Sequence, residues 1–223
     1  MNTAIIVAAG SGTRFNSEKP KQFVEINGKP LIAHTIERFG AAKSIDSIVL
    51  VIAQDSIDEF QTIVEKFKLQ KVSEVVEGGA TRAESVRNGL GMVRNETAVV
   101  AVHDGARPLV TPEEIDATIS KAAEFGAACL VAPVTDTIKT IRGGEIAATL
   151  DRTQLRRALT PQAFRVEVLR KAFEGVELDG SITDECYLVE KLGHPISIIE
   201  GSSRNIKITH PDDLLIAQRF LER

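Results

Sequence analysis

Near its amino terminus the chain reads Ala4-Ile5-Ile6-Val7-Ala8-Ala9-Gly10-Ser11-Gly12-Thr13-Arg14, an apolar run that leads into a glycine-rich turn ending in arginine. The run from Ala4 to Ala8 is continuous and rich in β-branched residues, a pattern typical of a strand buried on both faces. Such strands form parallel sheets that helices cover on both sides, and ligands bind these sheets beyond the carboxyl ends of the strands. This stretch therefore predicts the first strand of a parallel sheet, followed directly by a candidate binding loop.

From this strand to Pro133, short apolar runs alternate with longer amphipathic segments. The short runs predict buried strands over residues 48–52, 72–76, 98–102 and 128–132, and the longer segments predict helices over residues 31–43, 55–67, 81–94 and 112–125. Because crossover connections between parallel strands are right-handed, successive helices should cover the faces of the sheet. The predicted fold class is α/β: a Rossmann-like, mostly parallel sheet flanked by helices.

The alternation of strand-like runs and helix-like segments stops after Pro133. Two alternating runs, residues 137–142 and 145–150, surround Gly143-Gly144 and predict a protruding β-hairpin. A two-stranded hairpin is marginally stable by itself, and the sequence shows no second core that would cover it. We therefore expect a single domain, 1–223, in which residues 135–158 form a dimerisation arm, and we expect a homodimer. Further helices are expected over residues 166–174, 184–192 and 211–221, and further strands over residues 196–199 and 205–208.

The composition argues against several classes of partner. Asp and Glu total 31 against 27 Lys and Arg, a formal net charge of −4, and aromatic residues make up only 4%. Nucleic-acid-binding surfaces are positively charged and often use aromatic stacking, so we expect no nucleic-acid partner. The sequence shows no signal peptide and no apolar run of about 18 residues, so we expect no membrane partner and a cytoplasmic location. The two cysteines, Cys129 and Cys186, lie far apart in sequence and predict no zinc site.

The glycine-rich turn matches neither of the two familiar phosphate-binding motifs. A Walker loop requires Gly-x4-Gly-Lys-Ser/Thr, and a dinucleotide fingerprint requires a third glycine where this chain has Phe15. The turn is nevertheless followed by a second cation, Lys21, whose direction the preceding Pro20 helps to fix. Backbone N–H groups that glycines expose, together with one arginine and one lysine, are what a triphosphate needs. The alternative is a turn with only a structural role.

A second candidate stands at the end of the expected strand 98–102, where the chain reads His103-Asp104. A carboxylate there can hold Mg2+, which prefers oxygen ligands and is commonly shared between one or two carboxylates and substrate phosphates. The alternative is that Asp104 caps the next turn and pairs with Arg107. His103 is expected to orient the loop.

These segments and several later ones occur in an order that resembles the sugar-phosphate nucleotidyltransferases, and among them most of all the 2-C-methyl-D-erythritol 4-phosphate cytidylyltransferase family. The resemblance covers residues 4–221. Its motifs are Ala8-Ala9-Gly10-x-Gly12-x-Arg14 with Pro20-Lys21, Glu77-Gly78-Gly79 with Arg82 and Ser85-Val86, His103-Asp104-Gly105-Ala106-Arg107-Pro108, Leu150-Asp151-Arg152, Leu159-Thr160-Pro161-Gln162, Thr183-Asp184-Glu185, and Asn205-Ile206-Lys207-Ile208-Thr209.

The resemblance implies transfer of CMP from CTP to 2-C-methyl-D-erythritol 4-phosphate, a step of non-mevalonate isoprenoid precursor synthesis. The products are 4-diphosphocytidyl-2-C-methyl-D-erythritol and pyrophosphate. The attacking phosphate monoester has a second pKa of about 6, so it is largely anionic at neutral pH and needs no general base. The reaction instead needs cations and positioning, which relieve the repulsion between two anions.

The resemblance also implies roles for individual residues. Arg14 and Lys21 would stabilise the pentacoordinate phosphorus, whereas Arg152 and Lys207 would position the polyol phosphate. In the family, the arm that carries Arg152 reaches into the neighbouring subunit. Asp104 would bind Mg2+. The implied nucleotide- and substrate-binding positions are Ala8, Ala9, Gly10, Gly12, Gly79, Ser85, Asp104, Arg107, Thr137 and Thr183.

Other readings stay open at this point. Position 80 is Ala, where some members of the family carry Asp, so that side chain cannot contact the base. Ribitol-5-phosphate cytidylyltransferase is the alternative enzyme, with similar loops. A catalytically inactive nucleotide-binding subunit would lack one or more of Arg14, Lys21, Asp104, Arg152 and Lys207, yet all five are present. The missing third glycine disfavours a dehydrogenase.

Overall fold

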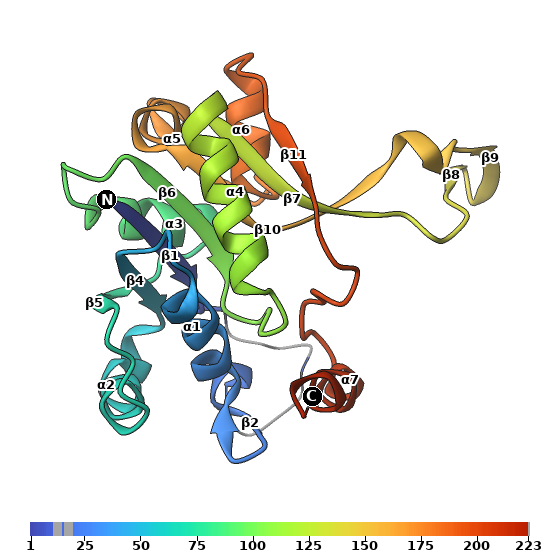
Figure 1. The fold of residues 1–223 in the computed structure, drawn as a ribbon. Coiled ribbons are helices and arrows are strands. Elements are labelled where there is room, and N and C mark those ends of the chain that lie inside the picture. Colours follow the sequence, from blue (N-terminus) through green and yellow to red (C-terminus); the bar gives the residue numbers. More distant parts are fainter. Residues whose placement is uncertain (11–14, 16–19, 223) are drawn as a thin grey trace.

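The structure is a computed structural model that describes residues 1–10, 15 and 20–222. The predicted site residues Gly12 and Arg14 lie outside these described residues. At the centre is a seven-stranded sheet with the order β11-β7-β10-β6-β1-β4-β5 (Figure 1). Its strands are β1 (Asn2–Val7), β4 (Ser47–Ile52), β5 (Val72–Glu77), β6 (Val99–Asp104), β7 (Ala127–Pro133), β10 (Arg156–Arg165) and β11 (Ser197–Glu200).

The sheet is mostly parallel, as the sequence predicts. β1 pairs in parallel with both β4 and β6, β4 with β5, and β7 with β11. Only β10 runs against its two neighbours, β6 and β7. Consequently the carboxyl ends of β1, β4, β5 and β6 meet at one edge of the sheet.

Helices cover both faces of this sheet. They are α1 (Leu31–Ala41), α2 (Ile57–Lys66), α3 (Arg82–Gly91), α4 (Pro112–Phe125), α5 (Val166–Phe173) and α6 (Glu185–Lys191). The last helix, α7 (Pro211–Leu221), packs in a separate cluster away from the sheet (Figure 1). Side chains of a strand alternate between faces, so Ile48 and Leu50 of β4 pack with α1, α2 and α4, whereas Val49 and Val51 pack with α3, α5 and α6. The continuous apolar runs in the sequence are therefore explained by two separate cores.

Residues 205–208 do not form the strand that their alternating pattern predicts. This segment has no strand partner among the described residues, and it leads into α7. Its Ile208 N–H donates to the backbone oxygen of Ala106 at 2.8 Å, and Ile208 itself is buried in a third, smaller core with α7 and the short hairpin β2 (Glu25–Ile26) and β3 (Lys29–Pro30). The alternation reflects one buried side and one cavity side, without a neighbouring strand.

The long strand β10 is not predicted by the sequence pattern. It contains Thr160-Pro161-Gln162, and its register with β7 shifts between Ala158 and Gln162. Proline lacks a backbone donor and polar residues interrupt the alternation, so the segment does not resemble a central strand. Its position between β6 and β7 brings Thr160 and Gln162 to the functional edge of the sheet.

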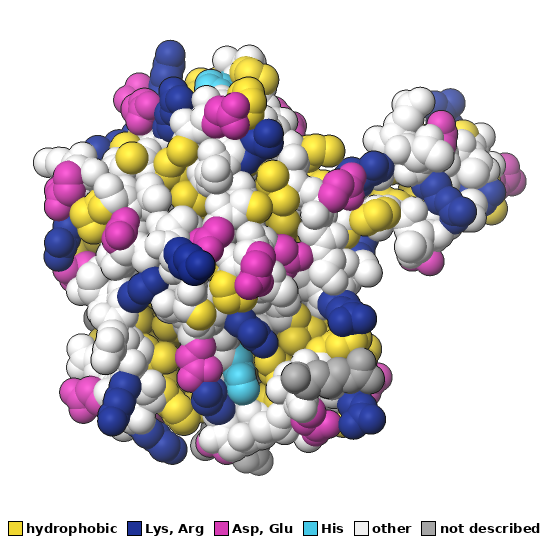
Figure 2. Space-filling model, viewed as in Figure 1, with side chains coloured by type: hydrophobic (Ala, Val, Ile, Leu, Met, Phe, Trp, Pro, Cys, Tyr) yellow, Lys and Arg dark blue, Asp and Glu magenta, His cyan; other side chains and the backbone are white. Residues whose placement is uncertain are grey.

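The hairpin of β8 (Lys139–Arg142) and β9 (Glu145–Thr149) stands clear of the sheet, as Figures 1 and 2 show. Every residue of both strands is exposed, including Ile141 (62%) and Ile146 (66%). The two strands pair with each other, and the arm rejoins the sheet through β10. Among the described residues, no helix combines the length and apolarity that crossing a membrane requires.

A chain of neutral hydrogen bonds supports the end of β6. The Asp104 N–H donates to Thr160 Oγ at 3.1 Å, and the Thr160 hydroxyl lies 3.0 Å from His103 Nδ1. The other ring nitrogen, Nε2, lies 3.2 Å from the backbone oxygen of Arg107, which can only accept. These partners assign the neutral tautomer with the proton on Nε2. Burial accordingly lowers the pKa of His103 to about 3.

This assignment predicts a pH dependence of stability. Because the pKa of His103 is lowered in the folded state, its contribution is complete above pH 6.5 and is lost as the pH falls toward 3. Between pH 7 and pH 5 the free energy of unfolding should fall by about 2 kcal/mol on account of this residue alone. In His103→Gln, urea unfolding at the two pH values should show a difference smaller by that amount. An equal difference in both proteins would show that folded His103 titrates normally.

Candidate active site

A cavity of about 490 Å3 opens at the carboxyl ends of β1, β5 and β6. This is the edge at which open α/β sheets bind ligands, and the volume lies in the range that small molecules occupy. Its walls come from five separate segments of the chain. The lining residues are Val7, Ala8, Ala9, Gly10, Lys21, Gln22, Gly79, Ala80, Thr81, Arg82, Ser85, Asp104, Gly105, Ala106, Lys207 and Thr209.

Small residues let the turns behind the cavity lie against one another. A Cβ on Gly78 would collide with that of Ala9, and one on Gly105 would come within 2.9 Å of the Ala8 Cβ. A Cβ on Gly79 would collide with Glu84, which belongs to the capping box at the start of α3. Close packing therefore accounts for both glycines at 78 and 79. The predicted contact of Gly79 with a nucleotide stays a prediction.

Ser85 is also held by the turn. Its hydroxyl accepts from the Gly79 N–H at 3.0 Å and donates to the Thr81 backbone oxygen at 3.0 Å. Ser85 thus fixes the shape of the β5–α3 turn, and one acceptor lone pair is left for a ligand.

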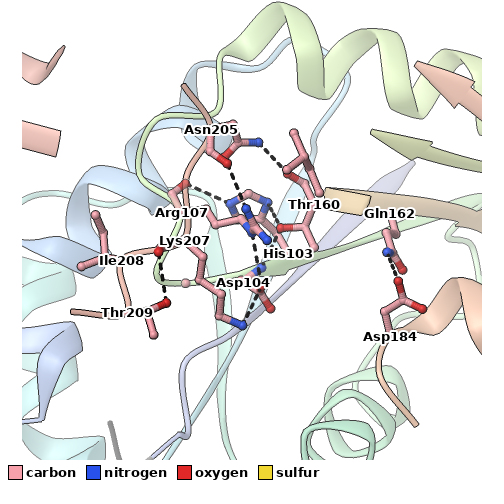
Figure 3. A network of polar contacts seen from close by, with 12 residues as sticks. His103, Asp104, Arg107, Thr160, Gln162, Asp184, Asn205, Lys207, Ile208 and Thr209 are labelled. Carbon is pink, nitrogen blue, oxygen red and sulfur yellow. Dashed lines mark hydrogen bonds and ion pairs between the residues drawn. The ribbon is translucent and has the colours of Figure 1, made fainter. Parts of the chain in front are cut away.

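The dominant feature of the cavity is Asp104, whose carboxylate meets three cationic side chains. Arg82 Nε lies 3.1 Å from one oxygen, and Lys207 Nζ and Arg107 Nε lie 2.9 and 3.3 Å from the other. Figure 3 shows Lys207 and Arg107 directed at this carboxylate from two different segments. The pairing of Asp104 with Arg107 that the sequence left as an alternative is present, but it is one of three contacts.

The cations set the charge state of Asp104. Burial alone would raise the pKa of this carboxyl, but the charges of Arg82, Lys207 and Arg107 outweigh burial and hold the pKa far below its usual range. Asp104 is therefore ionised at every physiological pH. Burial also disfavours the charge of Arg82, but Glu185 and Asp104 outweigh it and raise the pKa of Arg82, which stays protonated.

The segment 205–209 is tied to the cavity wall at several points. Arg107 Nη1 donates to the Asn205 backbone oxygen at 2.9 Å, and Asn205 Nδ2 donates to the Thr160 backbone oxygen at 2.9 Å (Figure 3). From the other side, Lys21 Nζ donates to the Ile208 backbone oxygen at 2.9 Å. Lys21 and Lys207 thereby reach the same cavity from opposite ends of the chain.

The structure brings together eight of the predicted site residues as cavity lining, and Arg107 joins them through Asp104. The eight are Ala8, Ala9, Gly10, Lys21, Gly79, Ser85, Asp104 and Lys207. Three others lie elsewhere on this chain. Thr137 and Arg152 belong to the exposed arm, where Arg152 Nη1 donates to the Thr135 backbone oxygen at 2.5 Å. Thr183 is exposed just before α6 and does not line the cavity.

Sequence reasoning assigned no role to two charged residues of this network. Arg82 lines the cavity, and its Nη1 donates to Glu185 Oε1 at 2.6 Å. Both residues occur in the motifs that carry the family resemblance, and Glu185 follows Asp184 at the start of a helix. Nothing in the sequence reveals that Glu185 is buried, because that depends on tertiary contacts of α6, such as those with Arg82 of α3 and Gln162 of β10.

The donor set for a metal ion is small. Among the described residues, no three His, Cys, Asp or Glu side chains gather closely enough to hold a metal ion. Asp104 is the one carboxylate among the described residues that line the cavity, and cations already contact both of its oxygens. This set fits Mg2+ only as an ion carried mainly by substrate phosphates, with one shared protein ligand.

Comparison with known proteins agrees with this geometry. The family model described as IspD, 2-C-methyl-D-erythritol 4-phosphate cytidylyltransferase, matches residues 2–223. The 2-C-methyl-D-erythritol 4-phosphate cytidylyltransferase of Bacillus velezensis is 44% identical over 220 residues, which cover 98% of this chain and 94% of that protein. The bifunctional enzyme IspD/IspF of Desulfotalea psychrophila is 43% identical, and the match spans 99% of this chain but only 57% of that longer protein.

A solved structure shares the fold over the full length. The crystal structure of 4-diphosphocytidyl-2C-methyl-D-erythritol synthase from Anaerococcus prevotii superposes with a TM-score of 0.86 at 30% identity, covering 100% of this chain and 96% of that one. Fold, cavity and sequence similarity thus lead to one conclusion: this chain belongs to the 2-C-methyl-D-erythritol 4-phosphate cytidylyltransferase family.

Proposed function

We propose that this protein transfers CMP from CTP to 2-C-methyl-D-erythritol 4-phosphate and releases pyrophosphate. The observation that carries the proposal is the cavity at the carboxyl ends of β1, β5 and β6. There, Lys21, Arg82 and Lys207 surround a site that suits two anionic substrates. Family membership supplies the identity of these substrates, since the relatives named above carry this activity in their names.

The chemistry follows from the charges. The monoester oxygen of the acceptor is already anionic at neutral pH, so the attack on the α-phosphorus of CTP needs no proton acceptor. His103 is not available as a proton acceptor, because both nitrogens of its neutral ring form hydrogen bonds, one with Thr160 and one with the Arg107 backbone oxygen. Catalysis then consists of bringing two anions together and stabilising the charge that develops on the transferring phosphorus.

Each charged residue of the site has its own role in this reaction. Lys21, together with Arg14, stabilises the pentacoordinate phosphorus and the departing pyrophosphate. Lys207 positions the phosphate of the acceptor, and Asp104 holds Lys207 in place through the 2.9 Å ion pair. Asp104 also offers one oxygen ligand to Mg2+, which when bound neutralises charge on the triphosphate and polarises its phosphorus–oxygen bonds.

We further propose that the functional unit is a homodimer in which the arm completes the partner's site. Arg152 and Thr137, which the resemblance implies as acceptor contacts, lie on the arm and not in the cavity of their own chain. The exposed Ile141 and Ile146 are apolar surface that a second subunit would cover. In a dimer of this kind each site combines Lys21 and Lys207 of one chain with Arg152 of the other.

The first prediction concerns the acceptor. With CTP and Mg2+, the protein should release pyrophosphate when 2-C-methyl-D-erythritol 4-phosphate is added, and much less when ribitol 5-phosphate replaces it. A coupled phosphate assay measures both, and omission of Mg2+ should lower the rate. Turnover of ribitol 5-phosphate alone would overturn the proposal in favour of the alternative enzyme, which the names of the relatives do not favour.

The second prediction concerns Lys21. Lys21→Ala should lower kcat by about 10² to 10³, the size typical for loss of one group that stabilises transition-state charge. Lys71→Ala is the matched control, because Lys71 Nζ also donates to a backbone oxygen, that of Ala42 at 2.7 Å, outside the cavity. Normal turnover in Lys21→Ala, with both variants folded, would remove Lys21 from the mechanism.

The third prediction concerns the shared site. Arg152→Ala and Lys21→Ala chains should each be nearly inactive alone. When co-expressed and purified together, they should recover about a quarter of wild-type activity, because half of randomly mixed dimers contain one intact composite site. Activity of the mixture that equals the mean of the two separate variants would show that each site is built from one chain.

A further inference from the structure

Glu185 is a buried carboxylate for which the mechanism above has no use. It is the first residue of α6 and has 0% of its surface exposed. Its Oε1 accepts from Arg82 Nη1 at 2.6 Å, whereas no hydrogen-bond partner for Oε2 is found among the described residues. A buried charge with an unsatisfied oxygen is costly, and an apolar residue of similar size would often be more stable. Stability alone therefore gives no reason for a carboxylate here.

The position of Glu185 is closely determined by its neighbours. Gln162 Nε2 of β10 donates to Asp184 Oδ2 at 2.8 Å, as Figure 3 shows. The Gln162 Oε1 accepts from the Cys186 N–H at 3.0 Å. Asp184 in turn caps α6 by accepting from the Tyr187 N–H at 3.0 Å. The residues on both sides of Glu185 are thus tied to the central sheet. The Glu185 side chain is therefore held in place, with little freedom to follow Arg82. Burial raises the pKa of its carboxyl, and the neighbouring charge of Arg82 opposes this shift and favours the ionised form.

Arg82 connects the Glu185 carboxylate to the cavity. Its Nη1 binds Glu185 and its Nε binds Asp104, so one guanidinium bridges two carboxylates that lie on α6 and β6. Arg82 itself begins α3, whose start is fixed by the capping box of Thr81 and Glu84. Because Glu185 takes part of the hydrogen-bonding capacity of Arg82, the second oxygen of Asp104 is left to Lys207 and Arg107.

We propose that Glu185 is a positioning residue for cytidylyl transfer: it holds Arg82 against the cavity wall so that Asp104 can keep Lys207 where the acceptor phosphate binds. This inference rests on the proposed function. When Glu185 is neutral, the guanidinium of Arg82 has one anion left, Asp104, and can bind it through two parallel N–H groups. Lys207 then loses its place on that carboxylate.

The test compares Glu185→Gln with a matched control. Gln keeps the size and one acceptor oxygen but removes the charge. Asp116→Asn alters a carboxylate that accepts from Ser44 and Lys43 outside the cavity, so it should lower stability without changing kinetics. In Glu185→Gln, KM for 2-C-methyl-D-erythritol 4-phosphate should rise about tenfold or more, the range for loss of a charged hydrogen-bond partner, with KM for CTP unchanged. In a Lys207→Ala background the same substitution should have no further effect on that KM.

A structural readout separates this inference from the proposed function. In a crystal structure of Glu185→Gln without ligands, the Lys207 Nζ to Asp104 distance should exceed 4 Å, compared with 2.9 Å in the wild type. An inactive wild-type protein with this ion pair broken in the variant would refute the proposed function and support the positioning role. An intact ion pair, kinetics like those of Asp116→Asn, or an equal rise of both KM values would overturn the inference.

Discussion

The carboxylate of Asp104 is the charge on which the site depends. Arg82, Arg107 and Lys207 approach it from the start of α3, the turn after β6 and the segment before α7. Three cations this close together would repel each other without an anion between them. The same three cations hold the pKa of the buried Asp104 carboxyl far below its usual range, so that it stays ionised. The Asp104 carboxylate therefore holds together three cationic side chains that come from separate parts of the chain. The overall charge of −4 conceals this local concentration of cations.

Two kinds of contact support this carboxylate from behind. The first is neutral: the backbone of Asp104 is held by Thr160, which is bonded to the buried, uncharged ring of His103. The second is charged: Glu185 binds the far side of Arg82. Because these supports come from β10, β6 and α6, the cavity wall is built before any substrate arrives. Such preorganisation is the main way in which an enzyme stabilises a charged transition state.

Much of the fold could be predicted from the sequence, and the failures have identifiable causes. In the first 133 residues, strand-like and helix-like spacings of apolar residues are easily told apart, so the sheet strands and helices there can be predicted within a few residues of their observed bounds. The two-residue strands β2 and β3 are too short to show such a pattern. Residues 205–208 alternate like a strand, yet their polar groups bind Ala106, Lys21 and Arg107 in place of a neighbouring strand. Strand β10 cannot be predicted from its sequence, because Pro161 and its polar neighbours resemble a loop. At the site, the structure brings Asp104 and Lys207 into one ion pair. Arg152 and Thr137 lie on the arm, outside the cavity of their own chain.

The sequence by itself determined the order of the main strands and helices up to residue 133, the glycine-rich stretch after β1 and the carboxylate at the end of β6. These features are local, because apolar periodicity and turn residues act over a few positions of the chain. Only the tertiary structure decided which cations pair with Asp104, that Glu185 is buried behind Arg82, and that His103 is neutral. Those properties depend on distances between residues as far apart in sequence as Arg82 and Glu185, and on exclusion of water, which no stretch of sequence contains.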